Sequence, residues 1–106
     1  MRQCYEKLVR DRIPEIMERE GIRYEIEVLT EELYWEALRK KLVEEAHEVA
    51  TAGPDELIHE LADVHEVLEA LQASHGITPD EVDALRKRRR EERGGFARKI
   101  FLRWTD

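Results

Sequence analysis

The sequence has little cysteine, no long apolar run and no excess of positive charge, and each of these absences excludes a class of protein. Its single cysteine, Cys4, rules out an intramolecular disulfide and suits a reducing cytoplasm. No apolar run approaches the ~18 residues of a membrane span, and residues 1–10 show no signal-peptide block. The net charge of −7 argues against a general nucleic-acid binder. We therefore expect a cytoplasmic protein that binds neither membranes nor nucleic acid.

The length and composition indicate one globular domain. The chain has 106 residues, of which 42% are hydrophobic and 41% are charged, and this is too apolar for a disordered chain. We find no repeat, low-complexity segment or domain boundary, so we expect residues 1–106 to form a single domain. A chain this short has a modest core, which favours an oligomer.

The charges are divided along the chain. Residues 42–85 contain twelve Asp or Glu and no Lys or Arg, whereas residues 86–103 contain nine Lys or Arg. One interpretation is an acidic helix pair followed by a basic helix, both with solvated faces. The other is a carboxylate-rich metal centre facing a cationic clamp, and the positions of the acids on their helices decide between them.

Helix start and stop signals predict four helices. The first spans residues 14–20, and the second, capped by Thr30, runs to about residue 52. Gly53-Pro54 breaks it, and Asp55 is predicted to cap a third helix that ends near residue 75. Residues 78–81 read Thr-Pro-Asp-Glu, a complete start signal for a fourth helix that runs to about residue 93.

Two short segments show the alternation of a strand. Apolar side chains alternate with polar ones in residues 22–28 and again in residues 100–104. We therefore predict a mainly α, all-α type fold, in which an antiparallel helical hairpin carries additional helices and two short accessory strands.

Four acids of the hairpin are predicted to converge. If each apolar stripe is centred on its leucine, Leu42 or Leu57, the first acid of each helix lies about 60° away and the second about 120° away. The rotational sense is the same on both helices, so in an antiparallel pair the acids fall on one side of the seam. Their heights agree, because the inner pair lies six residues from Pro54 and the outer pair nine. These acids are Glu45, Glu48, Glu60 and Asp63.

Converging carboxylates repel one another unless a cation lies among them. Hard oxygen ligands without thiolate favour Mg²⁺, with Mn²⁺ as the other candidate. An alternative is that these are ordinary acids at the boundary of amphipathic helices. Two Glu-x-x-His pairs, Glu44/His47 and Glu56/His59, also suggest a di-iron site. However, three of those four side chains point away from the apolar stripes and Glu56 is only lateral, which disfavours it.

The acids match a known signature. The runs Glu44-Glu45-Ala46-His47-Glu48 and Glu60-Leu61-Ala62-Asp63 resemble the EExxE…ExxD motif of the MazG-like and phosphoribosyl-ATP pyrophosphohydrolase-like all-α superfamily. Residues 7–14, KLVRDRIP, resemble the KLVRDKIP start of one branch, and residues 93–96, RGGF, resemble its GGF ending.

The resemblance implies hydrolysis of a nucleoside triphosphate between its α and β phosphates, giving a monophosphate and pyrophosphate. It implies Mg²⁺ held by Glu45, Glu48, Glu60 and Asp63, the set expected from the helix geometry. Glu44 fits the motif but points outward in our projection. The family also implies a homodimer or homotetramer with the nucleotide between subunits.

The triphosphate requires cations besides the metal. Lys41 lies one turn before Glu45 on the same flank, and Lys7 and Arg10 belong to the family-like opening. Lys87, Arg90 and Arg93 recur at helical spacing and could form a clamp. A carboxylate, Glu45 or Glu48, could orient the attacking water or take its proton.

The sequence leaves several functions open. The first is a Mg²⁺-dependent nucleotide pyrophosphohydrolase with a house-cleaning role. The others are a phosphoribosyl-ATP pyrophosphohydrolase of histidine synthesis, a non-catalytic nucleotide-binding module and a purely structural helical protein. No motif reads a nucleobase edge, so the base and sugar preference is not predicted.

Overall fold

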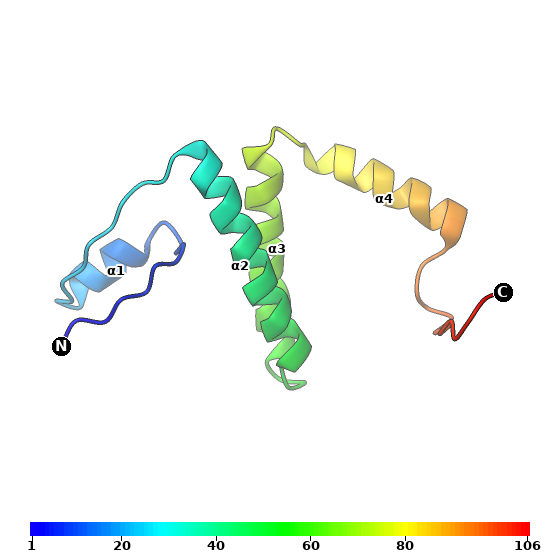
Figure 1. Ribbon diagram of the computed structural model, residues 1–106, viewed down its shortest axis with the longest axis horizontal. Helices are drawn as coiled ribbons and strands as arrows, with labels where there is room; N and C mark the ends of the chain where they lie inside the picture. Colours follow the sequence, from blue (N-terminus) through cyan, green and yellow to red (C-terminus); the bar gives the residue numbers. More distant parts are fainter.

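The computed structural model describes residues 1–106 and contains four helices. Their bounds are α1 Ile13–Arg19, α2 Glu31–Thr51, α3 Leu57–Ser74 and α4 Pro79–Arg93. Helices α2 and α3 form the predicted antiparallel hairpin in the middle of the molecule (Figure 1). All four helices lie within a few residues of their predicted positions, and none is long and apolar enough to cross a membrane.

Side-chain caps are present at the predicted starts of α2 and α4, but the cap predicted for α3 is not. The Thr30 hydroxyl accepts from the Leu33 backbone N–H at 3.4 Å, and Thr78 and Glu81 form a reciprocal capping box at the start of α4. The prediction that Asp55 caps α3 is wrong. The residue that precedes α3 is Glu56, without a side-chain cap, because a turn on the Gly53 carbonyl already accepts the Glu56 and Leu57 N–H groups.

The two predicted accessory strands, residues 22–28 and 100–104, are absent. A strand needs a neighbouring strand to receive its backbone hydrogen bonds. The first segment joins α1 to α2 on one side of the hairpin, and the second follows α4 on the other side (Figure 1). Because the hairpin stands between them, neither segment has a partner within the chain, and both are irregular.

The hairpin contains the only extensive helix packing, between α2 and α3. Leu38 and Val67 are its buried residues, at 3% and 8% exposure. Trp35 fastens its open end, since the indole N–H donates to the Ser74 carbonyl at 3.1 Å and the ring lies 4.7 Å from that of His75. Helices α1 and α4 lie on opposite sides of this hairpin, which gives the molecule an extended shape of 58 × 34 × 27 Å (Figure 1).

Candidate metal centre

Three of the four predicted acids meet on one side of the hairpin. Glu45 on α2 and Glu60 and Asp63 on α3 each offer a carboxylate oxygen, and these oxygens lie within 4.8 Å of one another. All three side chains are partly buried. We call these three residues the carboxylate cluster. Two helices position it because the acids have matched offsets from their apolar stripes, as the periodicity predicts.

Glu48, the fourth predicted acid, is exposed and does not join the group within 4.8 Å. It is nevertheless an electrostatic neighbour of the cluster. Partial burial raises the pKa of Glu60, and the negative charges of Glu48, Asp63, Glu45 and Glu56 raise it further, in that order. Proximity of like charges favours the neutral form of a carboxyl group. The raised pKa of Glu60 therefore reflects its partial burial first and its acidic neighbours second.

Lys41 lies beside the cluster, as its place on the flank of α2 predicts. Its Nζ is 3.6 Å from Glu45 Oε1 and 3.8 Å from Glu44 Oε2. The side chain of Glu45 is 15% exposed and that of Glu44 57%. The outward orientation predicted for Glu44 thus agrees with its exposure, and Lys41 bridges the inward and outward acids.

Arg10 reaches the cluster from the N-terminal segment. Its Nη2 donates to Asp63 Oδ1 at 2.8 Å, which joins residues 53 positions apart in the chain. Family resemblance alone had marked Arg10, and no periodicity could have placed it against a particular acid. The pair brings a guanidinium, with several N–H donors in a fixed plane, to the edge of the carboxylate cluster.

The other predicted cations form no ion pair with the cluster. The Lys7 ammonium lies 5.5 Å from the centre of the Tyr5 ring, a cation–π contact. Lys87, Arg90 and Arg93 are exposed on α4, which leaves the hairpin on the side opposite to the N-terminal segment (Figure 1). Within a single chain, α4 therefore forms no clamp over the acids.

The di-iron alternative and the surface hollows have fewer features of a functional site than the carboxylate cluster. The four residues of the di-iron alternative, Glu44, His47, Glu56 and His59, are all exposed, and none belongs to the carboxylate cluster. Two shallow hollows of about 240 and 260 Å³ lie near the junction of α3 and α4. Their linings include one acid, Glu69, and none of the cluster residues. The chemistry therefore gathers at the cluster rather than in these hollows.

The donor set fits a hard divalent cation. Carboxylate oxygens from Glu45, Glu60 and Asp63 could hold Mg²⁺ or Mn²⁺ on one side, and the partly open edge leaves room for waters or phosphate oxygens. No thiolate or imidazole stands among the ligands, which disfavours softer metals. Arg10 and Lys41 lie at the edge of the cluster, where they could bind an anionic ligand.

Comparison with known proteins agrees with this geometry. The family model for phosphoribosyl-ATP pyrophosphohydrolase matches residues 4–90, which include the N-terminal segment, all four acids and most of α4. Searches of curated proteins and of solved structures give no match. The match covers most of the chain, so the chain belongs to the phosphoribosyl-ATP pyrophosphohydrolase family, within the MazG-like all-α superfamily of pyrophosphohydrolases acting on phosphoric anhydrides.

Proposed function

We propose that this chain is a Mg²⁺-dependent nucleotide pyrophosphohydrolase. It would cleave a nucleoside triphosphate between the α and β phosphates, releasing a monophosphate and pyrophosphate. The observation that carries the proposal is the convergence of Glu45, Glu60 and Asp63 within 4.8 Å in a chain of this family. Arg10 and Lys41 at the rim support an anionic substrate, because phosphate oxygens accept charge-assisted hydrogen bonds from such groups.

Each residue has a distinct task in this reaction. A bound Mg²⁺ would neutralise phosphate charge and acidify a water molecule. Glu48, exposed beside Glu60, is free to orient the attacking water and accept its proton. Arg10 and Lys41 would donate to phosphate oxygens as negative charge moves toward the leaving pyrophosphate. Both cations form ion pairs with acids of the cluster, which places them at the edge of the proposed metal site.

The large surface of the single chain favours an assembly of several chains. The accessible surface of the single chain is 10368 Å², whereas a compact monomer of 12.6 kDa would expose about 6,200 Å². The excess surface of each chain is more than enough for an obligate interface, which buries about 2,000–5,000 Å² counted over both partners. We infer a homodimer or homotetramer, with the nucleotide between subunits.

We also infer a cytoplasmic location, with which the free, exposed Cys4 is consistent because a reducing compartment keeps thiols free.

The test is pyrophosphate release from a panel of normal, deoxy and damaged nucleoside triphosphates with Mg²⁺ or Mn²⁺. We expect turnover that needs the metal and is lost in a Glu60→Gln/Asp63→Asn variant. The matched control is Glu66→Gln/Glu69→Gln, which changes two exposed acids of the same helix outside the cluster. Activity that persists in the cluster variant would refute the metal assignment, and metal-dependent binding without turnover would indicate a nucleotide-binding module.

A second substrate is favoured by the family match, whose model describes phosphoribosyl-ATP pyrophosphohydrolase. Phosphoribosyl-ATP carries the same triphosphate, so the same cluster could act on it. Its inclusion in the panel separates the two candidates. A clear preference for phosphoribosyl-ATP would place the enzyme in histidine synthesis, and a preference for damaged or deoxy nucleotides would support a house-cleaning role.

A further inference from the structure

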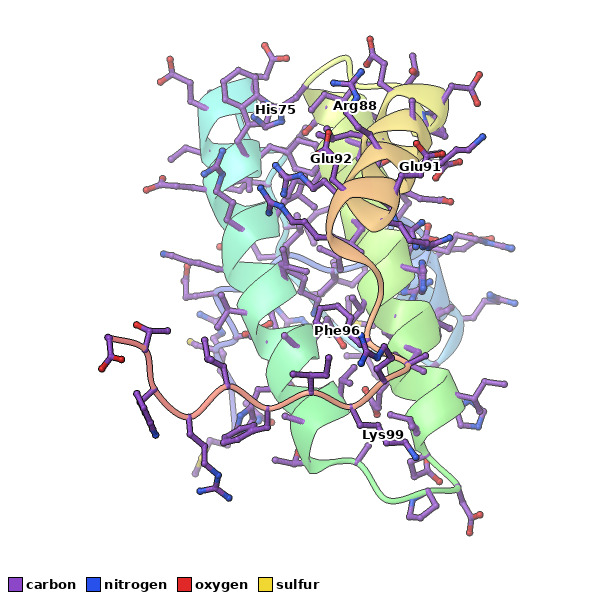
Figure 2. All side chains as sticks on the ribbon, turned by 90° about the vertical axis from the view of Figure 1, so that its right-hand side faces the viewer. His75, Arg88, Glu91, Glu92, Phe96 and Lys99 are labelled. Atoms are coloured by element: carbon purple, nitrogen blue, oxygen red, sulfur yellow. The ribbon has the colours of Figure 1, made fainter.

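The C-terminal part of the chain, residues 86–106, is a cationic extension that we call the basic arm. It comprises the second half of α4 and the segment that follows. It contains nine Lys or Arg and three acids. The arm forms one ion pair, in which Arg86 contacts Asp83, three residues earlier on the same helix, at 3.6 Å. Figure 2 looks onto the side of the molecule from which the arm projects, with Arg88 on α4 and Phe96 and Lys99 on the following segment.

The arm is also apolar where it is irregular. Five large apolar side chains after α4 are between 74% and 99% exposed: Phe96, Ile100, Phe101, Leu102 and Trp104. Monomeric proteins rarely leave so many neighbouring large apolar groups in water. A surface that is both cationic and apolar favours a protein partner with an acidic face and apolar side chains of its own.

The hairpin of this same chain has those properties. Residues 42–74 contain nine acids and no Lys or Arg, and the cluster is offset only by Arg10 and Lys41. Val43 and Ile58 are 70% and 72% exposed, but each follows its stripe leucine by one residue and lies on the flank away from the acids, so charge rather than apolar contact carries the match. The charge of the basic arm is therefore complementary to the hairpin, and long-range attraction of this kind guides association.

The arm of one chain is badly placed for the cluster of the same chain. Arg10 ties the N-terminal segment to Asp63, so the cluster faces the side of the hairpin on which α1 lies (Figure 1). Helix α4 leaves on the opposite side after a short turn, residues 75–78. Its 15 residues place its C-terminal end about 22 Å from its start. The hairpin itself thus separates the arm from its own cluster, whereas a second copy can turn the cluster side of its hairpin toward the arm.

We propose that the basic arm of one copy docks on the acidic side of the hairpin of a second copy and supplies phosphate-binding cations to that copy's carboxylate cluster. In a two-fold dimer the exchange is reciprocal, so each site contains acids from one chain and arm cations from the other. Lys87, Arg90 and Arg93 recur along α4 at helical spacing and are the cations assigned to this task. The phosphate-binding role of the arm cations rests on the proposed function, whereas the docking of the arm on a second copy does not.

Complementation between two defective variants tests the exchange. One variant is Glu60→Gln/Asp63→Asn, and the other is Lys87→Gln/Arg90→Gln/Arg93→Gln, which keeps good helix formers on an exposed helix. After subunit exchange in an equimolar mixture, half of the dimers are mixed and each holds one complete site. We therefore expect about a quarter of the wild-type activity from the mixture, and near none from either variant alone.

The matched control for the arm variant is Arg2→Gln/Arg19→Gln/Arg23→Gln, which removes three exposed cations outside the arm and should keep near-normal activity. If the wild type is active and the mixture shows no more activity than the two variants separately, the exchange is refuted. If the wild type releases no pyrophosphate, the proposed function is wrong, and the docking is then decided by a second measurement without catalysis.

That measurement is carbodiimide coupling of arm lysines to hairpin carboxylates in a mixture of ¹⁴N- and ¹⁵N-labelled protein. Docking between copies predicts peptides that join Lys87 or Lys99 of one isotope to Glu60, Asp63 or a neighbouring acid of the other isotope. If every joined arm–hairpin peptide carries a single isotope, or if no arm–hairpin peptide forms, the proposal is overturned. Mixed-isotope peptides would support it whatever the substrate proves to be.

Discussion

Both the α2–α3 hairpin and the basic arm contain α-helix, but only the helices of the hairpin pack extensively against another helix. The hairpin buries Leu38 and Val67, fastens its open end through Trp35 and gathers three acids within 4.8 Å. Helix α4, whose second half belongs to the arm, is capped at both ends, but neither this helix nor the rest of the arm contains a buried residue. Capping and helix propensity suffice to define a helix, but only packing gives it fixed neighbours. Chemistry can therefore be assigned within one chain for the hairpin, whereas the arm needs a partner.

The largest expected difference between the two regions is in stability. Leu38→Ala removes a side chain that is 3% exposed in the hairpin and should lower the free energy of unfolding by about 2–5 kcal/mol. Leu85→Ala on α4, at 47% exposure, is the matched change and should cost much less in the isolated chain. Urea unfolding at several protein concentrations measures both. A large, concentration-dependent loss in Leu85→Ala would mean that α4 is covered by another copy.

The next effect compares two adjacent acids of the hairpin. Glu45→Gln removes a carboxylate of the cluster and should lower kcat/KM about 100-fold, or about 2.7 kcal/mol. Glu44→Gln changes the exposed neighbour and should lower it only a few-fold. Steady-state pyrophosphate release at saturating Mg²⁺ provides the comparison. Equal losses in the two variants would contradict the inward and outward assignment and would give Glu44 a role in the site.

Arg10→Gln tests the link between the N-terminal segment and the cluster. Loss of one charge-assisted hydrogen bond to phosphate should raise KM about tenfold. The same change should tighten Mg²⁺ binding measured by calorimetry, since Arg10 donates to Asp63 and would compete with the metal for this carboxylate. Arg12→Gln, whose cation pairs with the local Glu15, is the control and should change neither quantity. Weaker Mg²⁺ binding in Arg10→Gln would show that the pair holds the cluster in shape.

The smallest effect is the pH dependence that Glu60 confers on the metal-free protein. Its raised pKa means that the folded state holds this proton more tightly than the unfolded state. The stabilising contribution is full below the ordinary value of 4.5 and is lost as the pH rises through the pKa of the folded state. The melting temperature of Glu60→Gln should therefore exceed that of the wild type by a margin that grows from pH 4 to pH 7. Saturating Mg²⁺ should stabilise the wild type and reverse the order.

Local signals predicted the helices and the meeting of three of the four acids, because both depend on short-range patterns in the sequence. Thr30 and the Thr78–Glu81 box mark helix starts through hydrogen bonds that span three residues, so a short window contains all of the information. The offsets of Glu45, Glu60 and Asp63 from their apolar stripes required only one further step, a short antiparallel loop.

Features that depend on distant partners were not predictable in the same way. The alternation in residues 22–28 and 100–104 describes side chains that fit a sheet, but the chain supplies no neighbouring strand. The Arg10–Asp63 pair spans 53 positions and obeys no period. The direction in which α4 leaves the hairpin depends on the four-residue turn before it, and the sequence had suggested only that its cations could form a clamp.

The contacts of Trp35 with Ser74 and His75 make its fluorescence a reporter of the hairpin, and Trp104 is a second fluorescent reporter. Of the two tryptophans, Trp35 lies at the fastened end of the hairpin and Trp104 lies 74% exposed on the basic arm. Each region thus carries its own fluorophore, in environments of opposite polarity. Trp35→Phe and Trp104→Phe would isolate them, so that opening of the hairpin and covering of the arm can be followed separately in solution without any attached dye.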